Sequence, residues 1–275
     1  MVLEALKIVY PEQYGMLEEV FSDRGYFVRE YRLHDPIDRD RFKEIIVRVK
    51  IPYFSLKIYN MVKNGELPIV FPSIATPSDP IIRRIAEGLL LVTRRSGNYS
   101  LWRASQLALE IAQSLIYSEE YGSPDYPIIV LYNNHGDCDV KVYLALSILQ
   151  AMNVSSGILS IENKELNTSH ALLLVNVQLP PWINGSRCNY YMVNNTRYYI
   201  AETAISNNIL MSPDIVRNYC IGCIDLLLYC SLENWGKTCR FIPSIYSYGL
   251  RGEGAIWLYT ENLVEKLILH ICYNV

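Results

Sequence analysis

A long apolar helix constrains this chain more than any other feature of its sequence. The segment Gly136-Asp137-Cys138-Asp139 opens a run to about Met152 in which apolar residues occupy nearly every side of a helix. A helix that is apolar on all sides is normally buried at the centre of a domain. Asp137 is suited to cap its N-terminus, and Gly136 allows the preceding backbone to approach closely. The chain is therefore expected to fold around this helix.

The position of Cys138 at the start of this helix suits a thiol nucleophile. Free N–H groups and the helix dipole at a helix N-terminus favour the thiolate, and a neighbouring imidazolium favours it further. Asp137 and Asp139 act against this, because their carboxylates repel another negative charge. Cys138 therefore needs a histidine partner. Taken alone, such a cysteine is more often a small buried residue of a helix.

His170 and Glu202 can supply the two partners that a thiol nucleophile needs. His170 stands at the entry to the apolar run Ala171–Val177, and Glu202 lies near the end of the next β-rich segment, Arg197–Thr203. A carboxylate beside an imidazole fixes its tautomer and stabilises the imidazolium. The order nucleophile, base, orienter along the chain fits such a triad. His135 is a rival base, but its place just before the helix indicates that it lines the cleft.

Three segments resemble the transglutaminase-like superfamily of cysteine enzymes. GDCDVKVYLALSILQAMNV is similar to the nucleophile motif, SHALLLVNV to the histidine strand, and YYIAETA to the third segment, in a branch with Glu in place of the more usual Asp. The upstream TPSDP-IIRRIAEGL and the approach to GDCD resemble the family as well. The resemblance covers roughly residues 76–204. Val140 departs from it, because many members carry an acidic residue there.

The resemblance implies an α+β fold with a papain-like core, in which a central buried helix packs on an antiparallel sheet. We expect an N-terminal β-containing extension over residues 1–75 and a transglutaminase-like catalytic core over residues 76–210. Residues 211–275 are expected to form a cysteine-containing cap that ends in an amphipathic helix, because Leu263, Leu267 and Ile271 share one helical face.

The resemblance also implies a cysteine-dependent amide acyl-transfer enzyme with Cys138, His170 and Glu202 as its triad. With water as acceptor it would be a peptidase or amidase, which is favoured; with an amine it would be a crosslinking transglutaminase. A non-catalytic structural or binding module on the same fold is the alternative from another class. The family pairs the nucleophile's backbone N–H with an upstream oxyanion donor, for which Tyr117, Asn133 and Asn134 are candidates.

Local patterns predict elements outside the three segments. Residues 1–35 are expected to form a short helical piece followed by polar turns. Alternation over 45–52 predicts a strand that ends at Pro52. Helical spacing of apolar residues predicts helices from about Ile81 to Leu89 and from about Leu101 to Tyr117. Residues 118–136, rich in Gly, Pro and Tyr, are expected to form a loop.

Composition limits the classes of partner. The chain has 275 residues, a net charge of -3 and no long basic run, so nucleic acid is not an expected partner. The most apolar stretch, Cys220–Leu232, is interrupted by Asp225 and is too short for the roughly 18 apolar residues of a membrane span. The N-terminus does not resemble a signal peptide. We expect a cytoplasmic enzyme acting on a protein or peptide, and its oligomeric state is left open.

Four further cysteines lie between residues 205 and 258. Cys220 and Cys223 have the Cys-x2-Cys spacing of zinc ligands, but Cys230 and Cys239 are isolated. Plain thiols are favoured over a disulfide or a zinc site, with all three left open. No cofactor is expected.

Overall fold

The protein combines helices with an antiparallel sheet, and its architecture comes from a computed structural model. The structure describes residues 19–20, 23–34, 44–66, 74–94, 99–119, 125–163, 168–181, 183, 190–204, 221 and 239–246. The fold class is α+β, as expected from the sequence. Within the described ranges, every helix is too short or too polar to cross a membrane.

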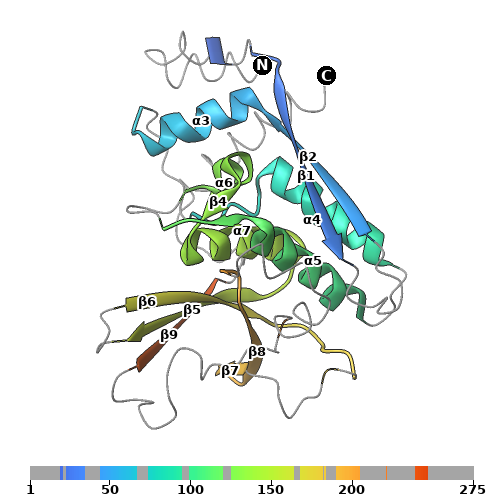
Figure 1. Cartoon of the computed structure of the whole chain (residues 1–275). Coiled ribbons are helices and arrows are strands. Elements are labelled where there is room, and N and C mark those ends of the chain that lie inside the picture. The colour runs from blue at the N-terminus through green and yellow to red at the C-terminus, as the bar shows by residue number, and fades with distance from the viewer. Residues whose placement is uncertain are drawn as a thin grey trace, which may run out of the picture.

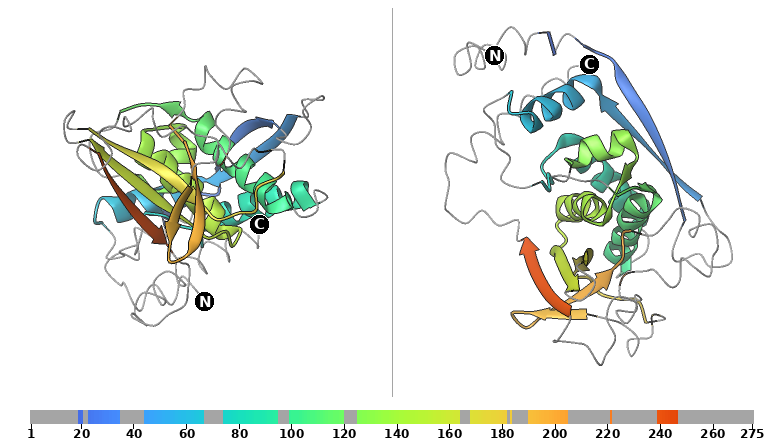
Figure 2. Two further views of the ribbon diagram at one scale, coloured as in Figure 1. Left: turned by 90° about the horizontal axis from the view of Figure 1, so that it is seen from below. Right: turned by 60° about the vertical axis from the view of Figure 1, so that its left-hand side comes forward.

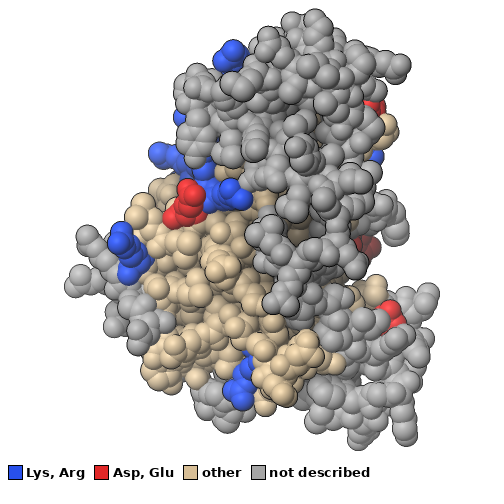
Figure 3. Space-filling view, turned by 180° about the vertical axis from the view of Figure 1, so that it is seen from behind, with Lys and Arg blue, Asp and Glu red and all other residues tan. Residues whose placement is uncertain are grey.

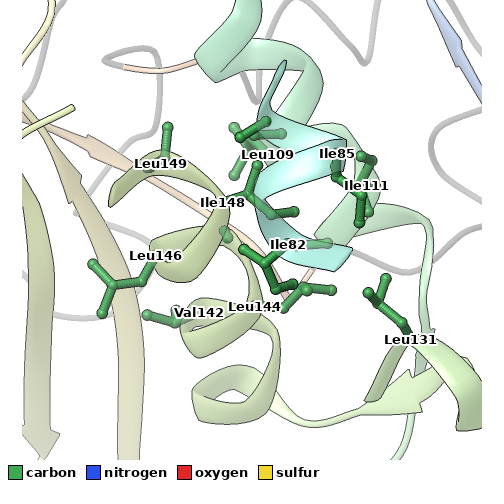
Figure 4. Packing of buried hydrophobic residues seen from close by; sticks show 14 of the residues in the cluster. Ile82, Ile85, Leu109, Ile111, Leu131, Val142, Leu144, Leu146, Ile148 and Leu149 are labelled. Atoms are coloured by element: carbon green, nitrogen blue, oxygen red, sulfur yellow. The ribbon is translucent and has the colours of Figure 1, made fainter. Parts of the chain in front are cut away.

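Helix α7 (Cys138–Ala151) forms the centre of the fold. It contacts α4 (Pro80–Thr93), α5 (Ser100–Ser114) and α6 (Pro127–Asn133). Figure 4 shows this packing through Ile82 of α4, Leu109 of α5, Leu131 of α6, and Leu144 and Ile148 of α7. Each fully buried side chain of this size contributes about 1.5–3 kcal/mol relative to an exposed one. Burial on all sides is what the apolar sequence of α7 requires.

Local sequence explains where these helices begin. Asp79 caps α4: its carboxylate accepts from the backbone N–H of Ile81 at 2.7 Å and of Ile82 at 3.2 Å. Pro80 takes the first helical position, where a missing N–H costs nothing. Pro127 does the same at the start of α6.

A five-stranded antiparallel sheet covers one side of α7. Its order is β7 (Tyr190–Val193), β8 (Thr196–Ala201), β6 (Thr168–Val175), β5 (Ser156–Asn163) and β9 (Cys239–Tyr246). Helix α7 contacts β6 and β5 (Figure 1). Alternate residues of β6 join the helical core, whereas those between them join a second apolar cluster on the other face. The central helix and the antiparallel sheet therefore pack together, as the sequence indicated.

A β-hairpin and a helix precede this core. Strands β1 (Tyr26–His34) and β2 (Glu44–Pro52) pair antiparallel and lead into α3 (Tyr53–Lys63). The hairpin contacts α4, α5 and α6, so these helices lie between it and the sheet (Figure 1 and the right-hand view of Figure 2). Its buried residues share the apolar cluster of α7. The division at residue 76 stays a prediction.

Three local expectations are wrong. Strand β1 lies where polar turns were expected, because pairing with β2 and packing on α5 outweigh its charged residues. The second helix ends at Ser114, since Leu115 is extended, and Ile116–Tyr117 forms β3. The expected loop contains α6, whose run Ile128–Leu131 is buried among the other helices.

The cap expected over residues 211–275 lies largely outside the described residues. Cys220, Cys223, Cys230 and the amphipathic helix fall there. Cys239 begins β9, but its side chain is not among those described.

On the face shown in Figure 3, the Lys and Arg side chains stand in separate groups, one of them beside acidic side chains.

Candidate active site

The N-terminus of α7 places Cys138 at the first helical position. The Asp137 carboxylate accepts from the backbone N–H of Val140 at 3.2 Å, so the aspartate caps the helix as its sequence predicted. Gly136 is needed here, because an added Cβ would lie 2.4 Å from a methyl carbon of Val140. Cys138 itself is a free, partly exposed thiol. This arrangement leaves the thiol open to an approaching substrate.

His170 near the start of β6 meets Glu202, which directly follows the neighbouring strand β8. The His170 Nε2 lies 2.8 Å from Oε2 of Glu202, and their side chains are 20% and 4% exposed. The other carboxylate oxygen of Glu202 accepts from the backbone N–H of Ala204 at 2.7 Å. Gln113 of α5 donates to the Glu202 carbonyl at 2.8 Å. The Ala204 N–H thus holds the carboxylate and Gln113 holds the Glu202 backbone, so the carboxylate can orient the imidazole.

Cys138 also interacts with the His170 ring. Burial lowers the pKa of His170, but hydrogen bonds from the ring to Cys138 and Glu202, together with their charges, outweigh it and raise the pKa to about 10. Since Nε2 faces Glu202, Nδ1 is the nitrogen left for the thiol. Thr203, next to Glu202, donates to the Cys138 carbonyl at 3.5 Å. The structure therefore brings all three residues together.

Asp139 repels a Cys138 thiolate less than a fully ionised carboxylate would, because its pKa is raised. Burial, a hydrogen bond to Asp137 and the charge of Asp137 raise the pKa of Asp139 to about 7. The Asp139 carboxylate also accepts from the backbone N–H of Val140 at 2.8 Å. Near neutral pH the Asp139 carboxyl is therefore protonated for part of the time and carries less than a full negative charge.

Lys141 belongs to the same cluster and was missed by sequence analysis. Its side chain is fully buried in α7, and its Nζ lies 5.9 Å from the ring centroid of Tyr117. Burial lowers the pKa of Lys141 to about 8, against the opposing effect of the Glu202 carboxylate. A lone lysine one helical turn after the cysteine, in an otherwise apolar helix, was the signal that could have revealed it.

The other cleft candidates lie beside the nucleophile on two short strands. Tyr117 of β3 pairs with Gly136 of β4 (His135–Gly136), two residues before Cys138. Burial and then the charge of Cys138 raise the pKa of Tyr117, which places its hydroxyl within electrostatic reach of the thiol. His135 Nδ1 lies 3.2 Å from the hydroxyl of Ser118.

The two asparagine candidates sit at the end of α6. Asn133 is exposed, and Asn134 adopts a left-handed conformation with φ 62°. The Asn134 carbonyl accepts from the Ile116 N–H at 3.0 Å and so anchors β3. Among these candidates, Tyr117 has a pKa that the charge of Cys138 raises.

No group of three or more His, Cys, Asp or Glu side chains suited to a metal ion occurs within the described ranges. The candidate ligands Cys220, Cys223 and Cys230 lie outside those ranges, and the Cys239 side chain is not described. Their state as thiols, disulfides or zinc ligands stays as predicted from sequence.

Comparison with known proteins gives a distant structural likeness. No protein-family model and no curated protein matches the sequence. Among solved structures, Legionella pneumophila LapG is 15% identical over 46% of this chain and 75% of its own, with a TM-score of 0.28. A calcium-bound form of the same protein is 11% identical over 66% of this chain and 98% of its own, with a TM-score of 0.30. At these TM-scores the likeness carries no inference about chemistry.

Proposed function

We propose that this protein is a cysteine-dependent amide hydrolase, a peptidase or amidase, on a transglutaminase-like, papain-like core. Cys138 is the nucleophile, His170 the acid–base group and Glu202 the residue that orients it. The contact of His170 with both Cys138 and Glu202 carries this proposal. A nucleophile beside a base, with a third group orienting that base, is the recurring arrangement of acyl-transfer enzymes.

The first half of the reaction forms a thioester. The Cys138 thiolate attacks the carbonyl carbon of an amide, and the carbonyl π electrons move onto oxygen. The tetrahedral intermediate collapses as the C–N bond breaks, and His170 gives its proton to the leaving nitrogen. Because the raised pKa of His170, about 10, keeps the ring protonated at neutral pH, that proton is available when the amine departs.

The second half releases the acyl group. His170, now neutral, takes a proton from water as the water oxygen attacks the thioester carbonyl. The C–S bond then breaks, which returns the thiolate and the imidazolium and frees a carboxylic acid. Glu202 holds the ring orientation through both halves and stabilises the imidazolium at the start and end of the cycle.

Tyr117 is our proposed oxyanion donor, together with the backbone N–H of Cys138. Its hydroxyl lies within electrostatic reach of Cys138, and β3 is held to β4 beside the nucleophile. A donor aimed at the developing oxyanion typically contributes about 100- to 1,000-fold to the rate.

Alkylation of the native protein tests the nucleophile without a known substrate. Iodoacetamide near pH 7, with the site of labelling read by mass spectrometry, should modify Cys138 before the other six of the seven cysteines. Labelling of another cysteine while Cys138 stays inert would overturn the proposal. Cys138→Ser is the matched control and should keep its melting temperature, since the two side chains are close in size.

An electrophilic peptide library then tests the acyl-transfer step. A covalent adduct on Cys138 that is lost in His170→Ala supports the triad. Incubating an acylated enzyme in water with and without a primary amine separates the acceptors, because hydrolysis releases an acid and transfer releases a new amide. Fast alkylation of Cys138 with no turnover of any library member would favour the non-catalytic module.

A further inference from the structure

Three long polar side chains of α5 are buried, and each hydrogen-bonds to a segment distant in sequence. They are at most 5% exposed and are Gln106, Glu110 and Gln113. Gln106 Oε1 accepts from the backbone N–H of Ile221 at 3.0 Å, and Glu110 binds His34 at the end of β1. A buried polar side chain is retained where it is hydrogen-bonded, because leaving it unpaired costs free energy. The role of each side chain therefore depends on the segment that it holds.

Gln113 holds the segment that carries the proposed orienting carboxylate. Its Nε2 donates to the backbone carbonyl of Glu202 at 2.8 Å, in a buried position. The side chain of the same residue, Glu202, contacts His170 Nε2 at 2.8 Å. A single residue thus accepts from α5 through its backbone and meets the imidazole through its side chain.

The sheet holds His170 and Glu202 in different ways. His170 lies within β6, whose eight residues all pair with β5. Strand β8 pairs with β6 over three residue pairs, and the last of them joins Ala201 to Leu173. Glu202 comes directly after that pair. Strand pairing with β5 therefore fixes the backbone of the histidine, whereas the backbone of the glutamate depends on other contacts.

The contacts that follow β8 are unequal. The Ala204 N–H donates to the Glu202 carboxylate, but this bond joins two residues of one short segment and leaves the segment itself free to shift. The Thr203 hydroxyl reaches the Cys138 carbonyl at 3.5 Å, which is long for an O–H···O hydrogen bond. The bond from Gln113, at 2.8 Å, is shorter and starts from a helix of the core. It is therefore the contact best suited to fix Glu202 relative to the core.

We propose that Gln113 is a positioning residue of the triad, because its amide fixes the backbone of Glu202 and thereby keeps the carboxylate against His170. This proposal rests on the function proposed above. Gln113 acts through Glu202 and takes no part in proton transfer. If the carboxylate moves away, the imidazolium loses part of a charge-assisted hydrogen bond, and the pKa of His170 falls from its raised value of about 10.

The titration of His170 tests this role and needs no substrate. Gln113→Met keeps the length of the side chain and removes the donor. The pKa of His170, followed by NMR and assigned with His170→Ala, should fall by about one when the hydrogen bond to the carboxylate weakens. Adduct formation at Cys138 with an electrophilic peptide should slow by about 10- to 100-fold, since a misplacement of about 1 Å can cost about 100-fold.

Gln106→Met is the matched control. It removes a buried hydrogen bond of the same helix, here to the N–H of Ile221, so it should lower the melting temperature about as much as Gln113→Met does. It should leave the titration of His170 and adduct formation at Cys138 unchanged. If Gln113→Met also lowers only the melting temperature, Gln113 is a packing residue and the proposal is wrong.

Gln113→Glu keeps the test decisive if Gln113→Met folds poorly. The two side chains, Gln and Glu, have nearly the same shape, and a protonated carboxyl can donate to the Glu202 carbonyl, whereas a carboxylate cannot. Because buried carboxyls ionise by about pH 9, the rate of adduct formation relative to wild type should drop below one between about pH 5 and pH 10. A ratio of one at every pH in this range would overturn the proposal.

The outcomes separate this proposal from the function on which it rests. If wild-type Cys138 forms no adduct while Gln113→Met still lowers the pKa of His170, the hydrolase proposal is wrong and the hold of Gln113 on the histidine–glutamate pair stands. If an adduct forms that requires His170 but is the same in Gln113→Met, the hydrolase proposal stands and this one is wrong. A lowered pKa with slower adduct formation, both absent from Gln106→Met, supports both proposals.

Discussion

Two histidine–glutamate pairs can be compared within the described part of the chain, and a thiol interacts with one of them, His170 and Glu202. At the end of β1, His34 Nδ1 lies 2.6 Å from Glu110 of α5. Near the start of β6, His170 Nε2 lies 2.8 Å from Glu202. In both pairs the glutamate is buried and raises the pKa of its histidine. In the contact between imidazole and carboxylate, the two pairs are therefore alike.

Their surroundings differ. Glu110 also accepts from the backbone N–H of His34 at 2.9 and 3.0 Å, so the pair ties the hairpin to the helical core. His34 is about a third exposed, and burial leaves Glu110 with a raised pKa despite the histidine. His170 instead interacts with Cys138 as well as with its glutamate. A histidine–carboxylate pair can serve a purely structural role, as His34 and Glu110 do. A nucleophile beside the histidine is what makes acyl transfer possible.

Replacing each histidine by alanine should give the largest difference in activity between the two pairs. His170→Ala should slow turnover by at least about 100-fold, because general acid–base catalysis by a positioned side chain contributes that much or more. His34→Ala should leave turnover and Cys138 alkylation unchanged. Initial rates and alkylation rates, measured at one pH on both variants, check this. Equal losses in the two variants would contradict the distinction.

Replacing each glutamate by glutamine should have smaller effects, on activity for one pair and on stability for the other. Glu202→Gln should lower turnover but retain more activity than His170→Ala, since an orienting group usually matters less than the nucleophile or base. Glu110→Gln should instead cost about 1–2 kcal/mol of stability, through weaker hydrogen bonds to His34, and keep the activity. Turnover rates and denaturant unfolding curves of the two variants test these expectations. A drop in activity for Glu110→Gln without loss of stability would be inconsistent with a purely structural pair.

A methyl group at Gly136 should disturb the triad pair and spare the hairpin pair. Because the added Cβ would lie 2.4 Å from Val140, Gly136→Ala should cost about 1–3 kcal/mol of stability and slow alkylation of Cys138. Gly88 is the matched control, since an added Cβ there has no atom within 4 Å and the residue is exposed in α4. Gly88→Ala should be neutral or stabilising. Similar destabilisation by both substitutions would refute the steric account.

The smallest effect should come from pH. Glu110 raises the pKa of His34 above its usual 6.5 in the folded protein, so folding favours the protonated ring. The stabilisation is fully present below about pH 6.5 and is lost as the pH rises through the raised value. The difference in unfolding free energy between wild type and His34→Gln should therefore shrink between pH 6 and pH 9. It should stay near or below about 1 kcal/mol, because solvent screens a partly exposed pair.

The same sign holds for His170, whose pKa is raised to about 10, so its stabilisation should persist over most of that pH range. Urea unfolding of the wild type and of both histidine variants measures the two trends together. A stability difference for His34→Gln that grows with pH would mean that the direction of its pKa shift is wrong.

The features that depend on neighbours along the chain could be predicted from the amino-acid pattern. The apolar run after Cys138 predicts a buried helix, Asp137 predicts its cap, and the order Cys138, His170, Glu202 predicts three segments that suit one site. Capping and periodicity are short-range properties, so a pattern of residues is enough to reveal them.

The contacts between residues far apart in the chain could not be predicted in this way, because they depend on how the elements pack. Strand β1 carries charged residues and forms because β2 pairs with it, and β3 forms because Tyr117 reaches Gly136. The burial of Lys141 beside Tyr117 and Glu202 follows from the packing of α7 against segments distant in sequence. The charge of a side chain depends on the groups and the solvent that surround it in space, and the order of residues does not specify these directly.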